Sequence, residues 1–180
     1  LGLGEDRSGI MALDPALTVG DKLASALALL DTVFEIEITP NRPDCLSVIG
    51  VAREIAAIQK VGLTYPDFKL VDKGNTISKR TSIKIAAPEH CPRYVARLLE
   101  DIKIKPSPFW LQERLLSIGQ RPINNIVDVT NFVLMETGQP LHAFDFDFLA
   151  ENRIVVRAAG ENETFTTLDE KARDLTPGML

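Results

Sequence analysis

The stretch GQRPINNIVDVTNFVLMETGQPLHAFDFD, residues 119–147, determines the organisation that we expect for this 180-residue chain. Within it, polar and apolar residues recur with the spacing of a helix that has one face of each kind. Its polar members are Asn124, Asn125, Asp128, Thr130, Asn131, Glu136, Gln139, His142 and Asp145. A polar row beside an apolar row is typical of a pocket wall on a packed helix, so we expect any chemistry of this chain to lie here.

Local signals set the limits of the expected helix and mark its polar face. Asn124 or Asn125 is expected to cap the N-terminus, and Gly138 is expected to stop the helix. Asn124, Asp128 and Asn131 are spaced by four and three residues, so one face carries all three. Threonine and asparagine are poor helix formers in a helix interior, which favours a role for Thr130 and Asn131. The alternative is that such side chains cap a neighbouring element or bond backbone carbonyls, and the residues alone leave both open.

His142 follows a turn at 138–140 and precedes Asp145 by three residues. A histidine near a carboxylate can orient a water molecule or donate to an oxyanion, whereas the alternative is a structural histidine bonded within its loop. We expect no metal site, since the only other histidine is His90 and no cysteine is close in sequence. No G-x-S-x-G motif is present, so hydrolysis here would use a positioned water rather than a covalent intermediate.

The remaining chain mixes helix and strand patterns without a βαβ rhythm, which predicts an α+β fold. Helices are expected over 21–30, 45–60 and 108–118, with caps at Asp44 and Ser107 and stops at Gly62 and Gly119. Strands are expected over 10–13, 33–38, 82–86, 93–104 and 154–158, and a hairpin over 163–175. The hairpin turn, Asp169-Glu170, lacks glycine, so we expect a loop longer than two residues.

A polar linker at 64–81 predicts a boundary near 73–80, which divides the chain into 1–75 and 76–180. The proline-containing loop at 39–44 is a second candidate site, in which Arg42 could bind a phosphate and Asp44 a ligand. We favour a structural interpretation of this loop, with Arg42 paired to a neighbouring acid. Phe109 and Trp110 are expected to pack rather than to stack on nucleic-acid bases.

Composition excludes several classes of protein. The net charge of −5 and the pI of about 5.1 argue against a strong general nucleic-acid binder. Cys45 and Cys91 lie far apart without metal-ligand spacing, as expected for free thiols in a reducing cytoplasm. No apolar run approaches the ~20 residues of a membrane span, and no signal peptide is visible. Because both ends read as mid-chain sequence, we expect an internal segment of a longer protein.

Five motifs, taken in order, resemble bacterial phenylalanyl-tRNA synthetase β subunits. They are NRPDCLS at 41–47, IGVAREIA at 49–56, SPFWLQERL at 107–115, RPINNIVDVTN at 121–131 and GQPLHAFD at 138–145. The resemblance covers nearly the whole chain. It implies that 1–75 is the end of an N-terminal region with a first core (B1-like) domain, and that 76–180 is the N-terminal part of a B3/B4-like editing domain.

The resemblance implies a cytoplasmic α2β2 enzyme that joins phenylalanine to tRNA(Phe) using ATP and Mg²⁺. Its β subunit hydrolyses tyrosine wrongly attached to that tRNA. By motif, Thr130 and Asn131 match editing-pocket residues, and His142 matches the pocket histidine near the scissile ester. No cofactor or metal is expected within this chain, and its expected partners are tRNA(Phe) and the α subunit, not DNA or a membrane.

Two further expectations come with this resemblance. The family's acidic residue that senses the tyrosine hydroxyl falls beyond Leu180, so we expect an incomplete pocket and an inactive isolated chain. The alternative function is a non-catalytic scaffold of the same complex that binds tRNA and subunits.

Overall fold

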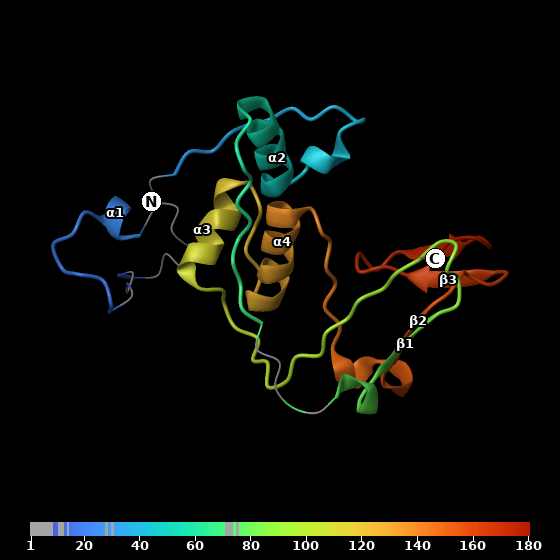
Figure 1. Ribbon diagram of the computed structural model, residues 1–180. Helices are drawn as coiled ribbons and strands as arrows, with labels where there is room; N and C mark the ends of the chain where they lie inside the picture. The colour runs from blue at the N-terminus through green and yellow to red at the C-terminus, as the bar shows by residue number, and fades with distance from the viewer. Residues whose placement is uncertain are drawn as a thin grey trace. The chain divides into compact units, whose positions relative to one another are not determined.

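The computed structural model describes residues 9–10, 13, 15–27, 29, 31–70, 74 and 76–180. The described elements are, in order, α1 (Leu23–Ala26), η1 (Pro43–Cys45), α2 (Val48–Gln59), η2 (Ile77–Lys79), β1 (Ser82–Ile85), α3 (Phe109–Ser117), α4 (Asn125–Thr137), η3 (Phe146–Phe148), η4 (Ala150–Asn152), β2 (Arg153–Val156), β3 (Glu163–Thr166) and β4 (Ala172–Leu175). Helices mixed with small sheets confirm the predicted α+β class (Figure 1).

The chain forms two compact units, each built from two segments. The first comprises the described residues of Leu1–Thr64 together with Ile104–Leu141, and the second comprises those of Tyr65–Lys103 together with His142–Leu180. The division into 1–75 and 76–180 that the sequence suggested stays a prediction. Among the described residues, none of the helices combines the length and apolar character that crossing a bilayer requires.

In the first unit, α3 and α4 pack against each other (Figure 1). Leu111 and Leu115, four residues apart on α3, are 2% and 0% exposed, so one stripe of this helix is fully covered. Trp110 meets Phe132 of α4 edge-on, with ring centroids 5.7 Å apart. Trp110 thus makes the expected packing contact, but only in part, because 58% of the residue is exposed.

Helix α4 has the limits that its sequence predicts. The side chain of Asn124 accepts hydrogen bonds from the backbone N–H groups of Ile126 and Val127, both at 3.0 Å. These bonds satisfy two of the donors that a helix N-terminus leaves without partners. The helix ends at Gly138, whose φ of 78° is the left-handed conformation that glycine adopts without strain.

The predicted start of α2 was wrong by three residues, whereas its predicted end at residue 60 lies one residue beyond the observed end. Asp44 lies in the 3₁₀ turn η1 and caps nothing, whereas Ser47 caps α2 by accepting a hydrogen bond from Gly50 N at 3.0 Å. The helix stops at Lys60, which adopts a left-handed conformation, before the predicted stop at Gly62. Asp44 is unavailable as a cap because Arg42 binds its carboxylate.

The predicted cap of α3 was also wrong. Pro108 occupies the N-cap position of this helix and forms no side-chain capping bond. Ser107 instead donates its hydroxyl to Asp128 of α4. A contact across 21 residues of sequence therefore replaces the local bond that the sequence suggested.

The second unit holds two small sheets. β1 and β2 pair in parallel, with Ser82 opposite Arg153 and Ile85 opposite Val156. β3 and β4 form the predicted antiparallel hairpin, with Glu163 opposite Leu175. The strands are joined by residues 167–171, and Glu170 has a φ of 60°. The prediction of a loop longer than two residues is confirmed.

Of four other expectations, two were wrong, one held in part and one lies partly outside the described residues. Residues 33–38 and 93–104 form no strand. Their alternating patterns indicate two faces, but a strand also needs a hydrogen-bonded neighbour, and the described chain supplies none for them. The helix expected over 21–30 is reduced to α1, with residues 28 and 30 outside the described part. The strand expected over 10–13 lies partly outside the described residues.

Candidate functional site

Asp128 is the most deeply buried polar residue on the predicted polar face of α4, at 0% exposure. Its Oδ2 accepts a hydrogen bond of 2.5 Å from the Ser107 hydroxyl, and its Oδ1 accepts one of 2.7 Å from the backbone N–H of Ile123. The carboxylate therefore ties α4 both to the residue that precedes α3 by two positions and to the loop before α4.

Thr130 and Asn131 are both half-buried on α4, and they differ in how their side chains are used. The Thr130 hydroxyl donates to the backbone carbonyl of Val127 at 2.7 Å, one turn earlier in the same helix. This bond to a backbone carbonyl of the same helix is the structural alternative for Thr130. Asn131 forms no side-chain hydrogen bond with any residue that the structure describes, so its amide remains available to a ligand or to water.

His142 is exposed and lies at the start of the second segment of the second unit. Its Nδ1 lies 3.1 Å from the carbonyl oxygen of Ala143, and its ring stacks on Phe144 with centroids 4.3 Å apart. A carbonyl oxygen only accepts, so Nδ1 donates in this bond and Nε2 is left as an acceptor in the neutral ring. An imidazole in this state can take a proton from water.

Asp145 does not pair with His142 in the described structure. Its Oδ1 accepts a hydrogen bond of 3.1 Å from the backbone N–H of Asp147 and so caps the short turn η3. Thr130 and Asn131 belong to the first unit, and His142 belongs to the second. The roles of these three residues in one pocket stay predictions.

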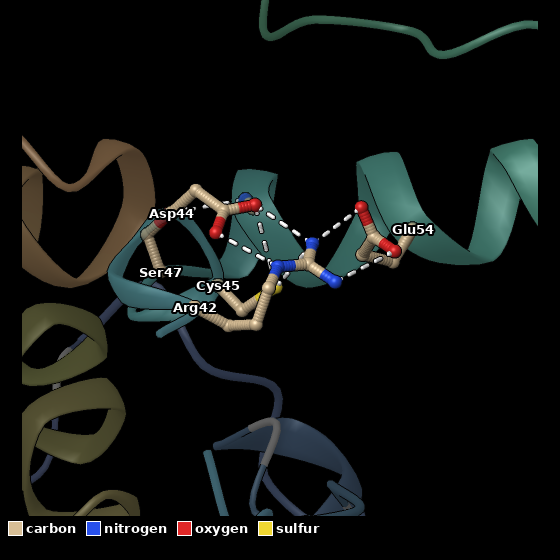
Figure 2. A network of polar contacts seen from close by, with 6 residues as sticks. Arg42, Asp44, Cys45, Ser47 and Glu54 are labelled. Atoms are coloured by element: carbon tan, nitrogen blue, oxygen red, sulfur yellow. Dashed lines mark hydrogen bonds and ion pairs between the residues drawn. The ribbon is translucent and has the colours of Figure 1, made fainter. Parts of the chain in front are cut away.

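The loop at 39–44 forms a network of polar contacts with α2 (Figure 2). Arg42 donates to both carboxylate oxygens of Asp44, at 3.0 and 2.8 Å, and its guanidinium also lies 2.6 Å from Glu54 of α2. A bidentate guanidinium–carboxylate pair is a strong directional contact. The expected pairing of Arg42 with an acid is confirmed, and the network fastens the loop to α2.

Close backbone packing supports this network. A Cβ atom at Gly50 would collide with the backbone carbonyl oxygen of Asp44, so only glycine lets the turn lie against α2. The hydrogen bonds from Arg42 hold the pKa of Asp44 at about 2, well below its ordinary value. Burial raises the pKa of the Cys45 thiol, which makes this cysteine a poor nucleophile.

Asp44, Cys45 and Glu54 bring their ligand atoms within 4.8 Å of one another, which is close enough for a Mg²⁺ site. It does not fit. Arg42 already pairs with both carboxylates, and a thiol is a poor ligand for a hard cation that prefers oxygen. The cluster holds the loop against α2 and does not have the ligands of a metal centre.

A hollow of about 560 Å³ lies on the second unit beside β3 and β4. It is lined by Glu161, Asn162, Thr164, Asp174, Leu175, Thr176 and Pro177. None of the three predicted site residues lines it, so it adds nothing to the editing hypothesis.

The chain belongs to the B3/4 domain family, because residues 90–180, half of its length, match that family. Over all 180 residues it is 53% identical to the protein named phenylalanine–tRNA ligase beta subunit of Syntrophus aciditrophicus (strain SB). It is also 53% identical to the protein of that name from Geobacter sulfurreducens, and 51% identical over 176 residues to the one from Moorella thermoacetica. The chain spans 22% of the length of each of these relatives. These comparisons confirm the resemblance that the five motifs indicated.

Sequence reasoning missed two contacts that the structure reveals. It placed Asp128 on the polar face of α4 but gave it no partner, and it assigned Ser107 to a cap. It also did not foresee Glu54 as the second acid bound to Arg42. Neither pairing has a local signal, since the partners are 21 and 12 residues apart.

Proposed function

We propose that the chain is part of the β subunit of a phenylalanine–tRNA ligase and contributes to a site that hydrolyses tyrosine wrongly attached to tRNA(Phe). The proposed site residues are Thr130, Asn131 and His142. The proposed partners are tRNA(Phe) and the ligase α subunit, in an α2β2 complex in the cytoplasm. ATP and Mg²⁺ belong to the synthetic reaction of the whole ligase and not to this chain.

Such a second site has a physical reason. A pocket that accepts phenylalanine rejects an analogue with one added hydroxyl only weakly, so a separate site that removes tyrosine improves accuracy. Hydrolysis of the aminoacyl ester needs a held water molecule, a group that takes its proton, and donors for the developing oxyanion. In the proposal, His142 Nε2 accepts the proton or orients the water, and the Asn131 amide binds the substrate or the oxyanion.

The proposal rests on one observation, which is the half-buried Asn131 side chain without a described hydrogen bond in a sequence of the B3/4 family. Asn131 is half-buried, is costly for the helix, and forms no hydrogen bond with the described residues. Binding of a ligand accounts better for a half-buried polar side chain without a described hydrogen bond than a contribution to the stability of α4 does. Thr130 is a weaker candidate for direct contact with the substrate, because its hydroxyl already donates a hydrogen bond to the carbonyl oxygen of Val127.

The experiment compares two reactions of the intact ligase to which we propose this chain belongs. Asn131→Ala and His142→Ala are each expected to slow release of tyrosine from Tyr-tRNA(Phe) by about 10²-fold, typical for loss of a general base or an oxyanion donor. Charging of tRNA(Phe) with phenylalanine should stay within twofold. Gln139→Ala, an exposed position between the two, is the matched control and should leave both reactions unchanged.

A rival function, a non-catalytic scaffold for tRNA and subunits, is favoured by one specific observation. Asn124, Asp128 and Thr130, three of the polar residues of this region, all bond within their own unit. If the Asn131 and His142 variants edit normally but assemble poorly with the α subunit, the scaffold function is correct and the editing role is wrong. The isolated chain should neither charge nor edit tRNA under either proposal.

A further inference from the structure

Asp128 has an unusual environment for a fully buried acid. Both of its hydrogen-bond donors, the Ser107 hydroxyl and the Ile123 amide, are neutral, and no ion pair joins it to a described cation. Burying a carboxyl group without a cation is costly unless its hydrogen bonds are well formed. The carboxylate supplies the acceptor that both donors need, so two directional bonds fix its place in the unit.

Asp128 holds the segment of α4 that presents Asn131. At ~100° per residue, Asn131 lies about 60° around the helix axis from Asp128 and one turn further along the chain. The two bonds of Asp128 reach different parts of the unit, residue 107 before α3 and residue 123 before α4. Together they restrain both rotation of α4 about its axis and sliding along it.

We propose that Asp128 is a positioning residue for Asn131, fixing the rotation and depth of α4 so that the Asn131 amide meets the substrate ester in a productive geometry. This inference rests on the proposed editing function. Misplacement of a binding group by about 1 Å can slow a reaction by about 10²-fold, so a buried contact that fixes one helix has kinetic consequences. Asp128 itself contacts no substrate in this account.

The proposal predicts which chemical property of Asp128 matters. Asparagine has the same shape, and its Oδ1 can accept from the Ile123 amide while its Nδ2 donates to the Ser107 oxygen. Asp128→Asn should therefore preserve the contact, whereas Asp128→Ala removes both bonds. A direct catalytic carboxylate would behave differently, because asparagine would not replace it.

The test measures deacylation of Tyr-tRNA(Phe) and charging with phenylalanine in the intact ligase, together with hydrogen exchange at the Ile123 amide. Asp128→Ala is expected to lower kcat for deacylation by about 30-fold with KM within threefold, to leave charging unchanged, and to speed exchange at Ile123 at least tenfold. Asp128→Asn should return kcat to within threefold of the wild type and restore slow exchange. Ser107→Ala, which removes one bond only, should give an intermediate loss of about fivefold.

Each outcome decides a separate point. Normal deacylation by Asp128→Ala, with slow deacylation by Asn131→Ala, would overturn the positioning role and leave the editing function standing. Deacylation as slow in Asp128→Asn as in Asp128→Ala would replace positioning with a direct role of the carboxylate. If Asp128→Ala does not fold, normal deacylation by Ser107→Ala overturns the proposal. Normal deacylation by Asn131→Ala defeats the editing function, and the positioning role with it.

Discussion

The N-terminal half of α4 and the segment around His142 contribute to the same proposed site but are held in different ways. In α4, the side chains of Asn124 and the buried Asp128 together accept four hydrogen bonds, three from backbone N–H groups and one from the Ser107 hydroxyl. Around His142, the side chains are exposed, and the imidazole has one hydrogen bond to its neighbouring residue and one ring stack. Placement of Asn131 is thus built into the unit, whereas the orientation of His142 depends on few contacts. Mutations should separate the two regions by their effect on stability.

Asp128→Ala should have the largest effect on stability. It leaves the buried Ser107 hydroxyl and the partly buried Ile123 amide without their acceptor, and we expect a loss of about 3 kcal/mol in the free energy of unfolding. Urea unfolding of the chain, followed by circular dichroism, measures this. His142→Ala is the counterpart from the other region and should change stability by less than about 0.5 kcal/mol, because its side chain is exposed. Equal losses for the two variants would remove the contrast.

Gly50→Ala should come next, since the added methyl group collides with the carbonyl oxygen of Asp44 and pushes the 3₁₀ turn away from α2. We expect a loss of about 2 kcal/mol from overpacking, offset in part by the better helix propensity of alanine. Gly62→Ala is the matched control, because a Cβ there meets nothing within 4 Å. Urea midpoints that fall equally in both variants would show that the close approach at Gly50 is unimportant.

Asn124→Ala should cost about 1 kcal/mol, the usual value of an N-cap. Asn131→Ala, on the same helix, should cost nothing measurable or stabilise the chain slightly, because its side chain has no described hydrogen bond and alanine is the better helix former. Thermal unfolding of both variants checks this pair. A cost at Asn131 as large as that at Asn124 would point to a structural role for Asn131 and weaken the editing proposal.

The smallest effect is expected from an exposed ion pair of the second unit. Arg157 donates to both oxygens of Glu163, at 2.8 and 2.6 Å, and with a bond from Gly160 N it lowers the pKa of Glu163 from 4.5 to about 2. A lowered folded-state pKa contributes stability above the unfolded value, and this contribution falls as the pH drops from about 4.5 to about 2. Solvent screening keeps it small.

Acid titration of the wild type and of Glu163→Gln measures this contribution. The difference in the free energy of unfolding between them should shrink as the pH falls through that window. A difference that stays constant with pH would mean that the ion pair adds no stability.

Much of α4 could be predicted because its signals are local. Asn124 supplies the cap, the polar and apolar spacing supplies the faces, and Gly138 supplies the stop, all within residues 124–138. The β3–β4 hairpin was predicted for the same reason, since its turn and its alternation lie within 163–175. The five motifs pointed to the β subunits that the chain resembles over its whole length, and three of them lie within the B3/4 match at 90–180.

The errors arose where a residue had two possible partners. Ser107 and Asp44 both have the chemistry of an N-cap, but Asp128 takes the hydroxyl of the first and Arg42 takes the carboxylate of the second. The partner of Ser107 lies 21 residues away, so no sequence spacing reports that contact, whereas the partner of Asp44 lies only two residues before it. The strands expected at 33–38 and 93–104 failed for a related reason, because alternation cannot specify a partner strand.

The most direct test of the central claim is a double-mutant cycle between Asn131 and His142, read as the rate of tyrosine release from Tyr-tRNA(Phe) by the intact ligase. If both side chains act on one ester, the double Ala variant should be slowed little more than either single variant, about 10²-fold in total. Losses that multiply to about 10⁴-fold would mean that the two residues act independently. Release as fast as in the wild type would contradict the editing role of both.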